Sequence, residues 1–257
     1  MRNGVFLQVR LASKRLPGKA LLALKGANVL QHAMRALLPI GAEVNAVLTD
    51  SRSAEPLAAI AANEGFRIFI GSENDVLSRF AQAVKQFRVD NVLRATGDNP
   101  LVSALMGREI LRIHEQERSD LSHYHDLPLG TGVEVISPEA LLIADSEARD
   151  PFEREHITTF LYRNRQRFKV IEADCPVEFS LPDSKVSIDN EEEYIFVQKI
   201  YRDLYLDRPI EIDRLVGWLK SHKGETVEGK DSSGSCNDAG NGYRPPEKMC
   251  VPNRKAE

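Results

Sequence analysis

The amino-acid sequence predicts an α/β protein in which helices cover both faces of a mostly parallel sheet. Short apolar segments alternate with segments whose apolar residues recur at helical spacing, which is the pattern of such a sheet. The chain has 257 residues, of which 42% are hydrophobic and 28% charged, so it can bury one large core.

Segments rich in apolar and β-branched residues predict the strands in the first part of the chain. They occupy residues 4–9, 44–49, 67–70, 91–95 and 132–136. Helical periodicity fills the intervals between them, at residues 29–38, 56–64, 76–87 and 104–117. Because parallel strands are joined by right-handed crossovers, we expect the loops that follow these strands to share one edge of the sheet.

The rest of the chain is less regular. Residues 168–172 and 185–188 predict strands, and residues 190–206 and 210–220 predict helices. From Gly224 onward small and polar residues dominate, and such a segment buries too little apolar surface to offset its chain entropy. We therefore predict one domain at residues 1–223 and a disordered tail at residues 224–257.

Charge and composition exclude several classes of protein. The formal net charge is −4, whereas a general nucleic-acid binder is usually basic. The sequence has no apolar segment long enough to span a bilayer and no apolar core of a signal peptide, so a cytoplasmic protein is expected. None of the 3 cysteines lies in a C-x-x-C pair, which argues against structural zinc and a disulfide framework.

Four cations and a serine gather in the loop after the first predicted strand, at Arg10, Ser13, Lys14, Arg15 and Lys19. Ligands of open α/β sheets bind at the carboxyl ends of strands, so this position favours a polyanion such as a nucleoside triphosphate over a solvated basic surface. The loop is not a Walker phosphate loop, because that motif needs a glycine where Ser13 stands.

Two aspartates follow predicted strands, and each precedes a helix or turn. They are Asp98, after the strand at residues 91–95, and Asp189, after the strand at residues 185–188. Either one could be an ordinary helix cap. Together on one edge of a sheet they could also hold Mg²⁺, which takes few protein carboxylates and fills its other positions with water and phosphate oxygens.

Four motifs in order give the sequence a family resemblance over residues 3–220. The motifs are Arg10-x-x-Ser13-x-Arg15-Leu16-Pro17-Gly18-Lys19, Gly71-Ser72-Glu73-Asn74-Asp75-Val76-Leu77-x-Arg79-Phe80, Thr96-Gly97-Asp98-x-Pro100-Leu101 and Glu153-Arg154-Glu155-His156-Ile157-Thr158. The chain resembles the cytidylyltransferases that activate sugars, which include the CMP-Kdo and CMP-sialic acid synthetases. It is most similar to their SpsF-type spore coat polysaccharide biosynthesis branch. The resemblance implies a three-layer, Rossmann-like α/β/α fold of the nucleotide-diphospho-sugar transferase type.

The resemblance also implies roles for individual residues. Asp98 and Asp189 would hold Mg²⁺, and Arg10 and Lys19 would act with them in catalysis. The residues expected to bind the nucleotide are Gln8, Arg10, Ser13, Arg15, Lys19, Thr49, Asp50, Ser72, Arg79, Thr96 and Gly97. The residues expected to face the acceptor are Glu134, Arg154, Glu155 and His156. The branch often has an aspartate where Gly132 stands, so the resemblance does not identify the acceptor.

The predicted function is therefore Mg²⁺-dependent transfer of CMP from CTP to a sugar or related acceptor, with release of pyrophosphate, in cell-surface polysaccharide biosynthesis. The expected partners are these small molecules and no nucleic acid or membrane; a homodimer could form through residues 132–172. One alternative is another nucleotidylyltransferase acting on a sugar phosphate or phosphonate. A glycosyltransferase or a non-catalytic CTP-binding protein is a second, although Asp98-Asn99-Pro100 lacks the D-x-D pattern of many glycosyltransferases.

Overall fold

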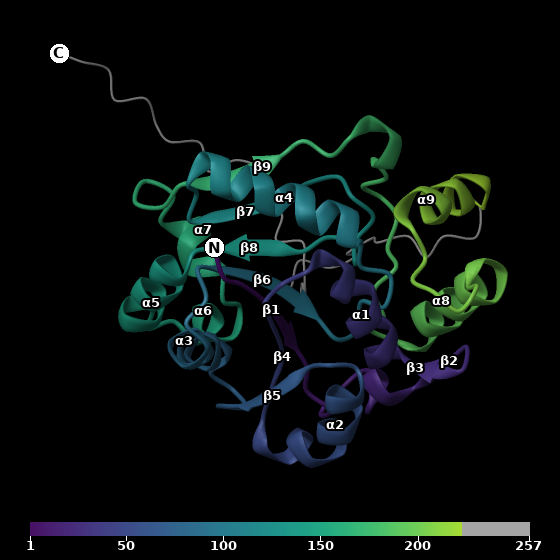
Figure 1. Cartoon of the computed structure of the whole chain (residues 1–257), viewed down its shortest axis with the longest axis horizontal. Helices are drawn as coiled ribbons and strands as arrows, with labels where there is room; N and C mark the ends of the chain where they lie inside the picture. The colour runs from purple at the N-terminus through teal and green to yellow at the C-terminus, as the bar shows by residue number, and fades with distance from the viewer. Residues whose placement is uncertain (223–257) are drawn as a thin grey trace.

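Seven strands form the central sheet in the order β5-β4-β1-β6-β8-β7-β9 (Figure 1). The computed structural model describes residues 1–222, so the predicted tail at residues 224–257 lies outside the described residues. The strands of the sheet are β1 (Asn3–Gln8), β4 (Val44–Thr49), β5 (Arg67–Ile70), β6 (Asn91–Thr96), β7 (Leu121–Tyr124), β8 (Glu134–Ile136) and β9 (Val170–Ala173). A separate two-stranded hairpin consists of β2 (Ala23–Leu24) and β3 (Ala27–Asn28).

Helices cover both faces of the sheet, which confirms the predicted fold class. The α-helices are α1 (Val29–Leu37), α2 (Ser51–Asn63), α3 (Val76–Phe87), α4 (Ala104–Glu117), α5 (Pro138–Glu147), α6 (Pro151–Glu155), α7 (Thr159–Arg163), α8 (Glu191–Leu204) and α9 (Ile212–Ser221). Short 3₁₀ helices are η1 (Lys19–Leu21), η2 (Leu38–Ile40) and η3 (Val177–Phe179).

Side chains alternate across the strands and divide the core into two layers. Val5 and Leu7 of β1 pack with apolar residues of α1, α2 and α4 on one face. Phe6 points to the opposite face and packs with residues of α3, α5 and α7. Both layers are fully buried, as expected for a sheet with two covered faces.

The carboxyl ends of the central strands lie level with one another. Strand β1 pairs in parallel with β4 and β6, and Gln8 is opposite both Leu48 and Thr96. Strand β8 is antiparallel to β6, with Glu134 at its start opposite Arg94. The ends of β1, β4 and β6 and the beginning of β8 therefore share one edge of the sheet.

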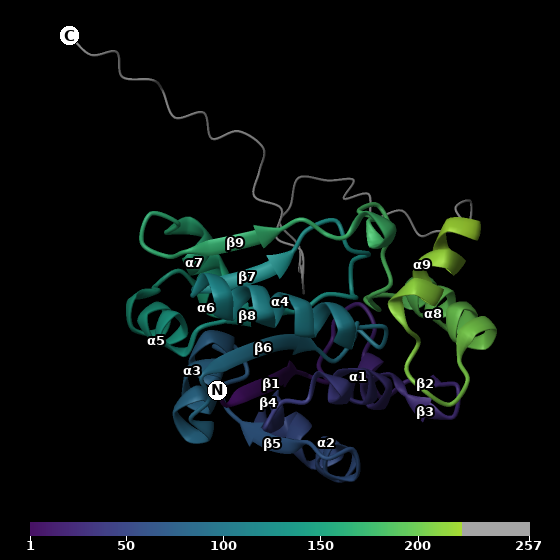
Figure 2. The same cartoon turned by 45° about the horizontal axis from the view of Figure 1, so that its top comes forward.

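Helices α8 and α9 lie beside this edge and bring a distant part of the chain to it (Figure 2). They form a third apolar cluster with Leu24 of the hairpin and with Val186 and Ile188. Gly130 lets the segment before α8 approach, because its φ is +104° and an added Cβ would lie 2.8 Å from the Ser187 nitrogen. The backbone nitrogen of Ile188 then donates to the Asp98 carbonyl oxygen at 3.0 Å.

Two sequence predictions about elements need correction, and one strand was missed. Residues 185–188 do not form a strand, because Lys185 makes only an isolated bridge to Leu129. The helix predicted at residues 56–64 begins at Ser51, because Asp50 caps it and Pro56 is accommodated inside it. Strand β7 was not predicted; β8 lies between β6 and β7 and is antiparallel to both, which makes the sheet mixed at that side.

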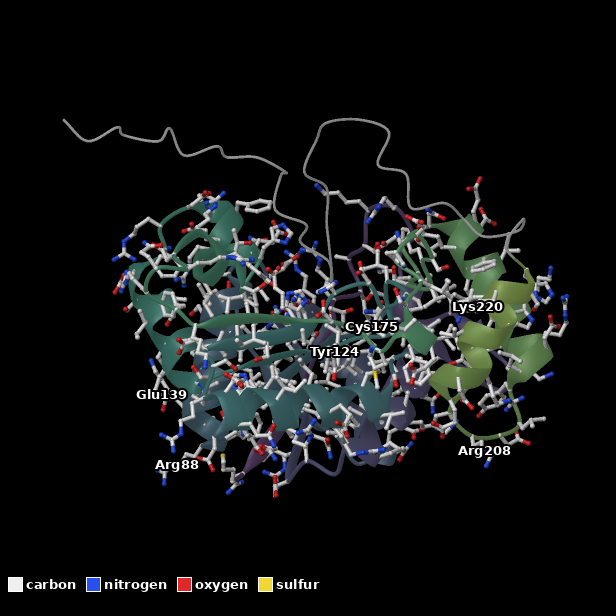
Figure 3. All side chains as sticks on the ribbon, turned by 90° about the horizontal axis from the view of Figure 1, so that it is seen from above. Arg88, Tyr124, Glu139, Cys175, Arg208 and Lys220 are labelled. Atoms are coloured by element: carbon white, nitrogen blue, oxygen red, sulfur yellow. The ribbon has the colours of Figure 1, made fainter. Side chains whose placement is uncertain are left out.

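The structure shows the state of one cysteine within the described residues. Cys175 is a buried free thiol near Tyr124 (Figure 3), and burial raises its pKa to about 11. Such a thiol is largely protonated near neutral pH and is a poor nucleophile.

Within residues 1–222, no helix is long and apolar enough to cross a membrane.

Candidate functional site

The basic loop after β1 is closed by its own backbone. The Leu11 carbonyl oxygen accepts hydrogen bonds from the nitrogens of Ser13 and Gly18. Gly18 has a φ of +69° and directly precedes η1, the short helix that begins at Lys19. The left-handed backbone at this turn favours glycine and directs the chain, and with it Lys19, back toward the sheet.

Lys19 lies between the two predicted metal-binding aspartates. Its Nζ donates to Asp98 Oδ2 at 2.5 Å and to Asp189 Oδ1 at 2.9 Å. Arg15 also reaches Asp189 Oδ1, at 3.2 Å. Residues that are 79 and 170 positions from Lys19 thus meet at one point of the sheet edge.

Asp98 reaches this point because Gly97 lies close against β1. The Gly97 nitrogen donates to the Gln8 carbonyl oxygen at 2.9 Å. An added Cβ at Gly97 would lie 2.6 Å from Cγ2 of Val9, so a larger residue would force the turn away. The sequence Thr96-Gly97-Asp98 is therefore a close turn from β6 that presents a carboxylate at the sheet edge.

Opposite charges determine the ionisation of this group. Burial disfavours the charged form of Asp189, but the ammonium groups of Lys19 and Lys185 outweigh it and lower the pKa of Asp189 to about 2. Burial likewise opposes the charge of Lys19, but Asp98 and Asp189 raise its pKa above the usual range. Lys19 and Asp189 are therefore both charged at neutral pH.

Sequence reasoning missed a second lysine at this point. Lys185 Nζ lies 2.9 Å from Asp189 Oδ2 and 2.6 Å from Glu193 Oε1. Glu193 also accepts from the Asp189 nitrogen at 2.6 Å and forms the capping box of α8 with Asn190. Asn190 and Glu193 have the spacing of a capping box, so this part of the network was visible in the sequence.

Thr49 and Asp50, which were predicted to bind the nucleotide, lie at the end of β4. Asp50 is buried and caps α2 through hydrogen bonds from the nitrogens of Arg52 and Ser53. The Ser53 hydroxyl donates to Asp50 and accepts from the Leu11 nitrogen, which joins α2 to the basic loop. The Asp50 carboxylate is thus part of the support of that loop.

Arg79 comes from α3 and is 1% exposed. Its Nη1 donates to the Ser72 carbonyl oxygen at 2.7 Å, and burial lowers its pKa to about 10. Asp50 and Arg10 lie within electrostatic range of this guanidinium. The second motif therefore packs against the same edge as the basic loop.

The predicted acceptor residue Glu134 has a buried partner that was not predicted. Glu134 Oε2 accepts from Arg94 Nη1 at 2.5 Å, and its Oε1 accepts from the Thr158 hydroxyl at 3.2 Å. Arg94 Nη2 lies 3.5 Å from Gln8 Oε1. A charged residue in each of two apolar strands is a sequence signal for such a pair, although only the strand order places them together.

The other predicted acceptor residues have different surroundings. Arg154 forms ion pairs with Asp75 and Asp145 at 2.6 and 2.8 Å, so it joins α6 to the beginning of α3. Glu155 faces the basic loop and lies 3.4 Å from Arg10. The His156 ring packs against Phe152, with 4.2 Å between the ring centroids.

Several buried polar atoms at this edge have no hydrogen-bond partner within the described residues. They are Thr49 Oγ1, Arg79 Nε, Arg94 Nε, Thr96 Oγ1, and Oδ1 and Nδ2 of Asn99. Buried polar atoms are normally satisfied, so their concentration near the ends of β4 and β6 is typical of a place where a polar ligand or water completes the bonding.

The carboxylates at Lys19 suit a divalent cation with oxygen ligands. Asp98 and Asp189 direct one oxygen each to a single point, which the Lys19 ammonium contacts. Hard cations such as Mg²⁺ and Mn²⁺ prefer oxygen ligands. Within residues 1–222 no group of 3 or more His, Cys, Asp or Glu side chains is arranged to hold a metal, so phosphate or water would have to supply the other ligands.

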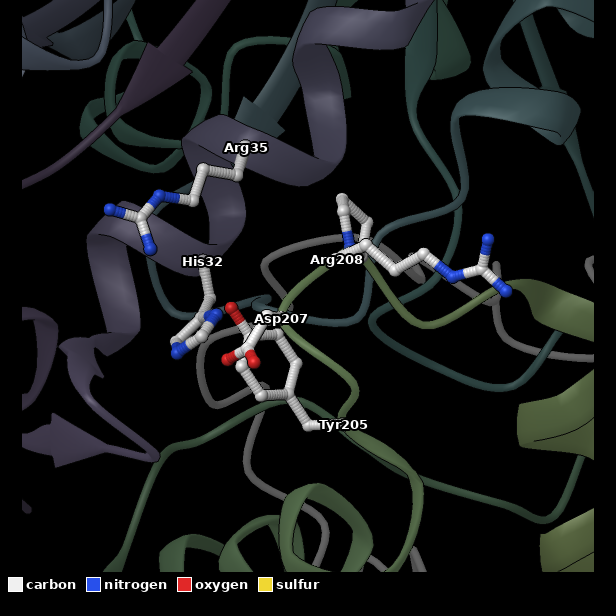
Figure 4. A pocket seen from close by; sticks show the side chains of 6 residues that line it. His32, Arg35, Tyr205, Asp207 and Arg208 are labelled. Carbon is white, nitrogen blue, oxygen red and sulfur yellow. The ribbon is translucent and has the colours of Figure 1, made fainter.

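A cavity of about 230 Å³ lies between α1 and the α8–α9 connection (Figure 4). None of the predicted site residues lines it; its lining is His32, Arg35, Tyr205, Asp207, Arg208 and Pro209. Arg35 is held by Glu64 at 2.6 Å, and His32 Nε2 is 2.6 Å from the Leu24 carbonyl oxygen. These contacts fix the lining residues of α1 in the fold.

Comparison with known proteins gives one consistent family. The sequence model of a family described as cytidylyltransferase matches residues 5–224. The spore coat polysaccharide biosynthesis protein SpsF of Bacillus subtilis is 30% identical over 204 residues, which are 76% of this chain and 85% of that protein.

Solved structures agree with this result. A cytidylyltransferase from Leptospira borgpetersenii superimposes with a TM-score of 0.79 at 25% identity, over 90% of this chain and 98% of that one. A CMP-2-keto-3-deoxy-manno-octonic acid synthetase in complex with CTP has a TM-score of 0.62 at 14% identity, covering 79% and 99% of the two chains. The second likeness concerns the fold alone.

Proposed function

The chain belongs to the cytidylyltransferase family, and from this membership we propose that it transfers CMP from CTP to a sugar or related acceptor, with Mg²⁺ as the divalent cation. It is a nucleotidyltransferase by family. Its likeness to a spore coat polysaccharide biosynthesis protein supports a role in making a cell-surface polysaccharide. The observation that carries the proposal is the contact of Lys19 with both Asp98 and Asp189.

In the proposed reaction an acceptor oxygen attacks the α-phosphorus of CTP. The bond from that phosphorus to the bridging oxygen breaks, and pyrophosphate leaves with the electron pair. The protein contributes mainly position and charge, as in other phosphoryl and nucleotidyl transfers. Asp98 and Asp189 would hold the cation, which when bound neutralises charge on phosphate oxygens.

The basic loop has the charges to bind and stabilise pyrophosphate. Arg10 and Arg15 are partly exposed, with side-chain exposures of 40% and 47%, so both can reach a ligand. Lys19 comes from the more buried end of the loop and would approach the phosphates nearest the reacting bond. Fixed cations at a developing negative charge are most effective where water is excluded.

A pyrophosphate-release assay tests this function. The full chain is incubated with CTP, Mg²⁺ and a panel of acidic sugars, sugar phosphates and phosphonates, and the transfer of the CTP α-phosphate to the acceptor is followed. We expect acceptor-dependent pyrophosphate and a product that carries CMP. UTP as the preferred substrate would indicate another nucleotidylyltransferase, and CTP binding without pyrophosphate for any acceptor would indicate a binding protein.

A pair of lysine variants in the same loop supplies the matched control. Lys19→Ala is expected to lower the rate by about 10²-fold, since it removes a cation next to the reacting phosphates. Lys14→Ala should change the rate by no more than about twofold, because this exposed side chain is screened by solvent and salt. Equal effects of the two changes would contradict the specific role of Lys19.

A further inference from the structure

The ammonium group of Lys19 lies at the point that a divalent cation on Asp98 and Asp189 would occupy. It contacts one oxygen of each carboxylate, at 2.5 and 2.9 Å. The other oxygen of Asp189 is held by Lys185 at 2.9 Å. Both oxygens of Asp189 therefore already contact a cationic side chain of this protein.

The charges around this point balance within the chain. Lys19, Lys185 and Arg15 supply three positive charges in direct contact with the carboxylates of Asp98, Asp189 and Glu193. A divalent cation entering alone would have to displace Lys19 and leave its ammonium group without a partner in a half-buried place. That displacement opposes metal binding.

A nucleoside triphosphate removes this obstacle. Its phosphate oxygens are partners for an ammonium group, and the four-carbon stem of a lysine lets the group move between neighbouring anions. When Lys19 moves to a phosphate oxygen, the two carboxylate oxygens become available to a cation. The phosphates then supply further oxygen ligands to that cation.

We propose that Lys19 keeps the Asp98–Asp189 pair closed to free metal, so that the site takes its divalent cation only together with a nucleoside triphosphate. The substrate of the site is then the metal–triphosphate complex. Lys185 has a different role, because it contacts Asp189 from the side held by Glu193 and does not reach Asp98 in the described structure. This inference rests on the proposed function.

Binding of MnCl₂ to the full chain, measured by isothermal titration calorimetry and by the electron spin resonance signal of free Mn²⁺, tests the proposal. Wild-type protein is expected to bind Mn²⁺ at least about tenfold more tightly with saturating CTP than without it, which corresponds to about 1.4 kcal/mol of coupling. Background binding of Mn²⁺ to CTP alone is measured and subtracted. Equal Mn²⁺ affinity with and without CTP would overturn the proposal, and this measurement needs no variant.

Two lysine variants then show whether Mn²⁺ is kept out because Lys19 lies at the metal position or only because the site carries positive charge. Lys19→Met should bind Mn²⁺ without nucleotide about tenfold more tightly than wild type, because the carboxylate pair is left open. Lys185→Met removes the same charge but leaves Lys19 in place, so its gain should stay below about threefold. Equal gains in both variants would overturn the proposal, and thermal unfolding checks that each variant is folded.

The result can be read independently of the enzymatic activity. Normal pyrophosphate release together with tight binding of free Mn²⁺ by wild type would reject this inference and leave the proposed function intact. Joint binding of Mn²⁺ and CTP, with no pyrophosphate release for any acceptor, would support this inference and reject the proposed function.

Discussion

Two clusters of opposite charge lie at the same edge of the sheet and differ in how firmly they are held. In one, Lys19 bridges Asp98 and Asp189, with side-chain exposures of 14%, 21% and 14%. In the other, Arg94 pairs with Glu134, and their side chains are only 6% and 8% exposed. The first cluster is reachable from solvent, whereas the second is enclosed between strands and α7.

This difference separates charges that can change partner from charges that cannot. Lys19 could exchange a carboxylate for a phosphate at little cost in free energy, because the phosphate replaces the carboxylate as the partner of its ammonium group. Arg94 and Glu134 have no such replacement, and separating them would leave a buried charge unpaired. The exchangeable cluster is therefore suited to binding and chemistry, and the enclosed one to holding β6, β8 and Thr158 in place.

The largest expected effect is on activity at the exchangeable cluster. Asp98→Asn should lower pyrophosphate release by about 10³-fold, which is about 4 kcal/mol of transition-state stabilisation, because it removes a carboxylate that would hold the divalent cation at the phosphates. Its free energy of unfolding should fall by no more than about 1 kcal/mol, since the pair is partly exposed. Asp213→Asn on α9 is the control, and near-normal turnover of Asp98→Asn would remove the metal assignment.

The next effect is on stability at the enclosed cluster. Arg94→Met should lower the free energy of unfolding by about 3 kcal/mol, because Glu134 is left buried without its cation. Arg167→Met breaks an exposed pair with Glu147, so it should change the free energy of unfolding far less than Arg94→Met. Denaturant unfolding measures both, and similar costs would show that the two pairs do not differ as described.

The double variant Arg94→Met/Glu134→Leu sharpens this comparison. Removing both charges leaves neither of them buried and unpaired, so most of the lost stability should return. A double variant as unstable as Arg94→Met alone would mean that shape, and not charge, is what the pair contributes.

The smallest expected effect concerns acid stability. Because the pKa of Asp189 is about 2 in the folded protein and near 3.8 when unperturbed, its ionisation stabilises the fold above about pH 4, and this is lost as the pH falls toward 2. The stability difference between wild type and Asp189→Asn should therefore shrink by about 1.5 kcal/mol from pH 5.5 to pH 2.5. A difference independent of pH would contradict the assignment of the low pKa.

Contiguous features of the site could be predicted from the sequence. Arg10, Ser13, Arg15 and Lys19 lie in one short loop after an apolar strand, and Asp98 follows a second such strand. Because the carboxyl ends of parallel strands meet at one edge, these residues were expected near each other. The same reasoning predicted strands β4 and β5 and helices α3 and α4 with their observed bounds.

Contacts that depend on sheet order could not be predicted. Arg94 meets Glu134 because β8 inserts antiparallel beside β6, and no local sequence pattern predicts this insertion. Residues 185–188 were assigned to a strand from their sequence pattern, but Lys185 makes only an isolated bridge to Leu129, and Ile188 bonds to the Asp98 carbonyl oxygen. The contacts of Lys185 with Asp189 and Glu193 follow from that irregular path.

A crystal structure of the full chain grown with CTP and Mn²⁺ tests the central claim most directly. Anomalous scattering should locate Mn²⁺ between the carboxylates of Asp98 and Asp189, with Lys19 Nζ moved onto a phosphate oxygen. Manganese bound elsewhere, with Lys19 still in contact with both aspartates and the triphosphate away from the basic loop, would contradict it.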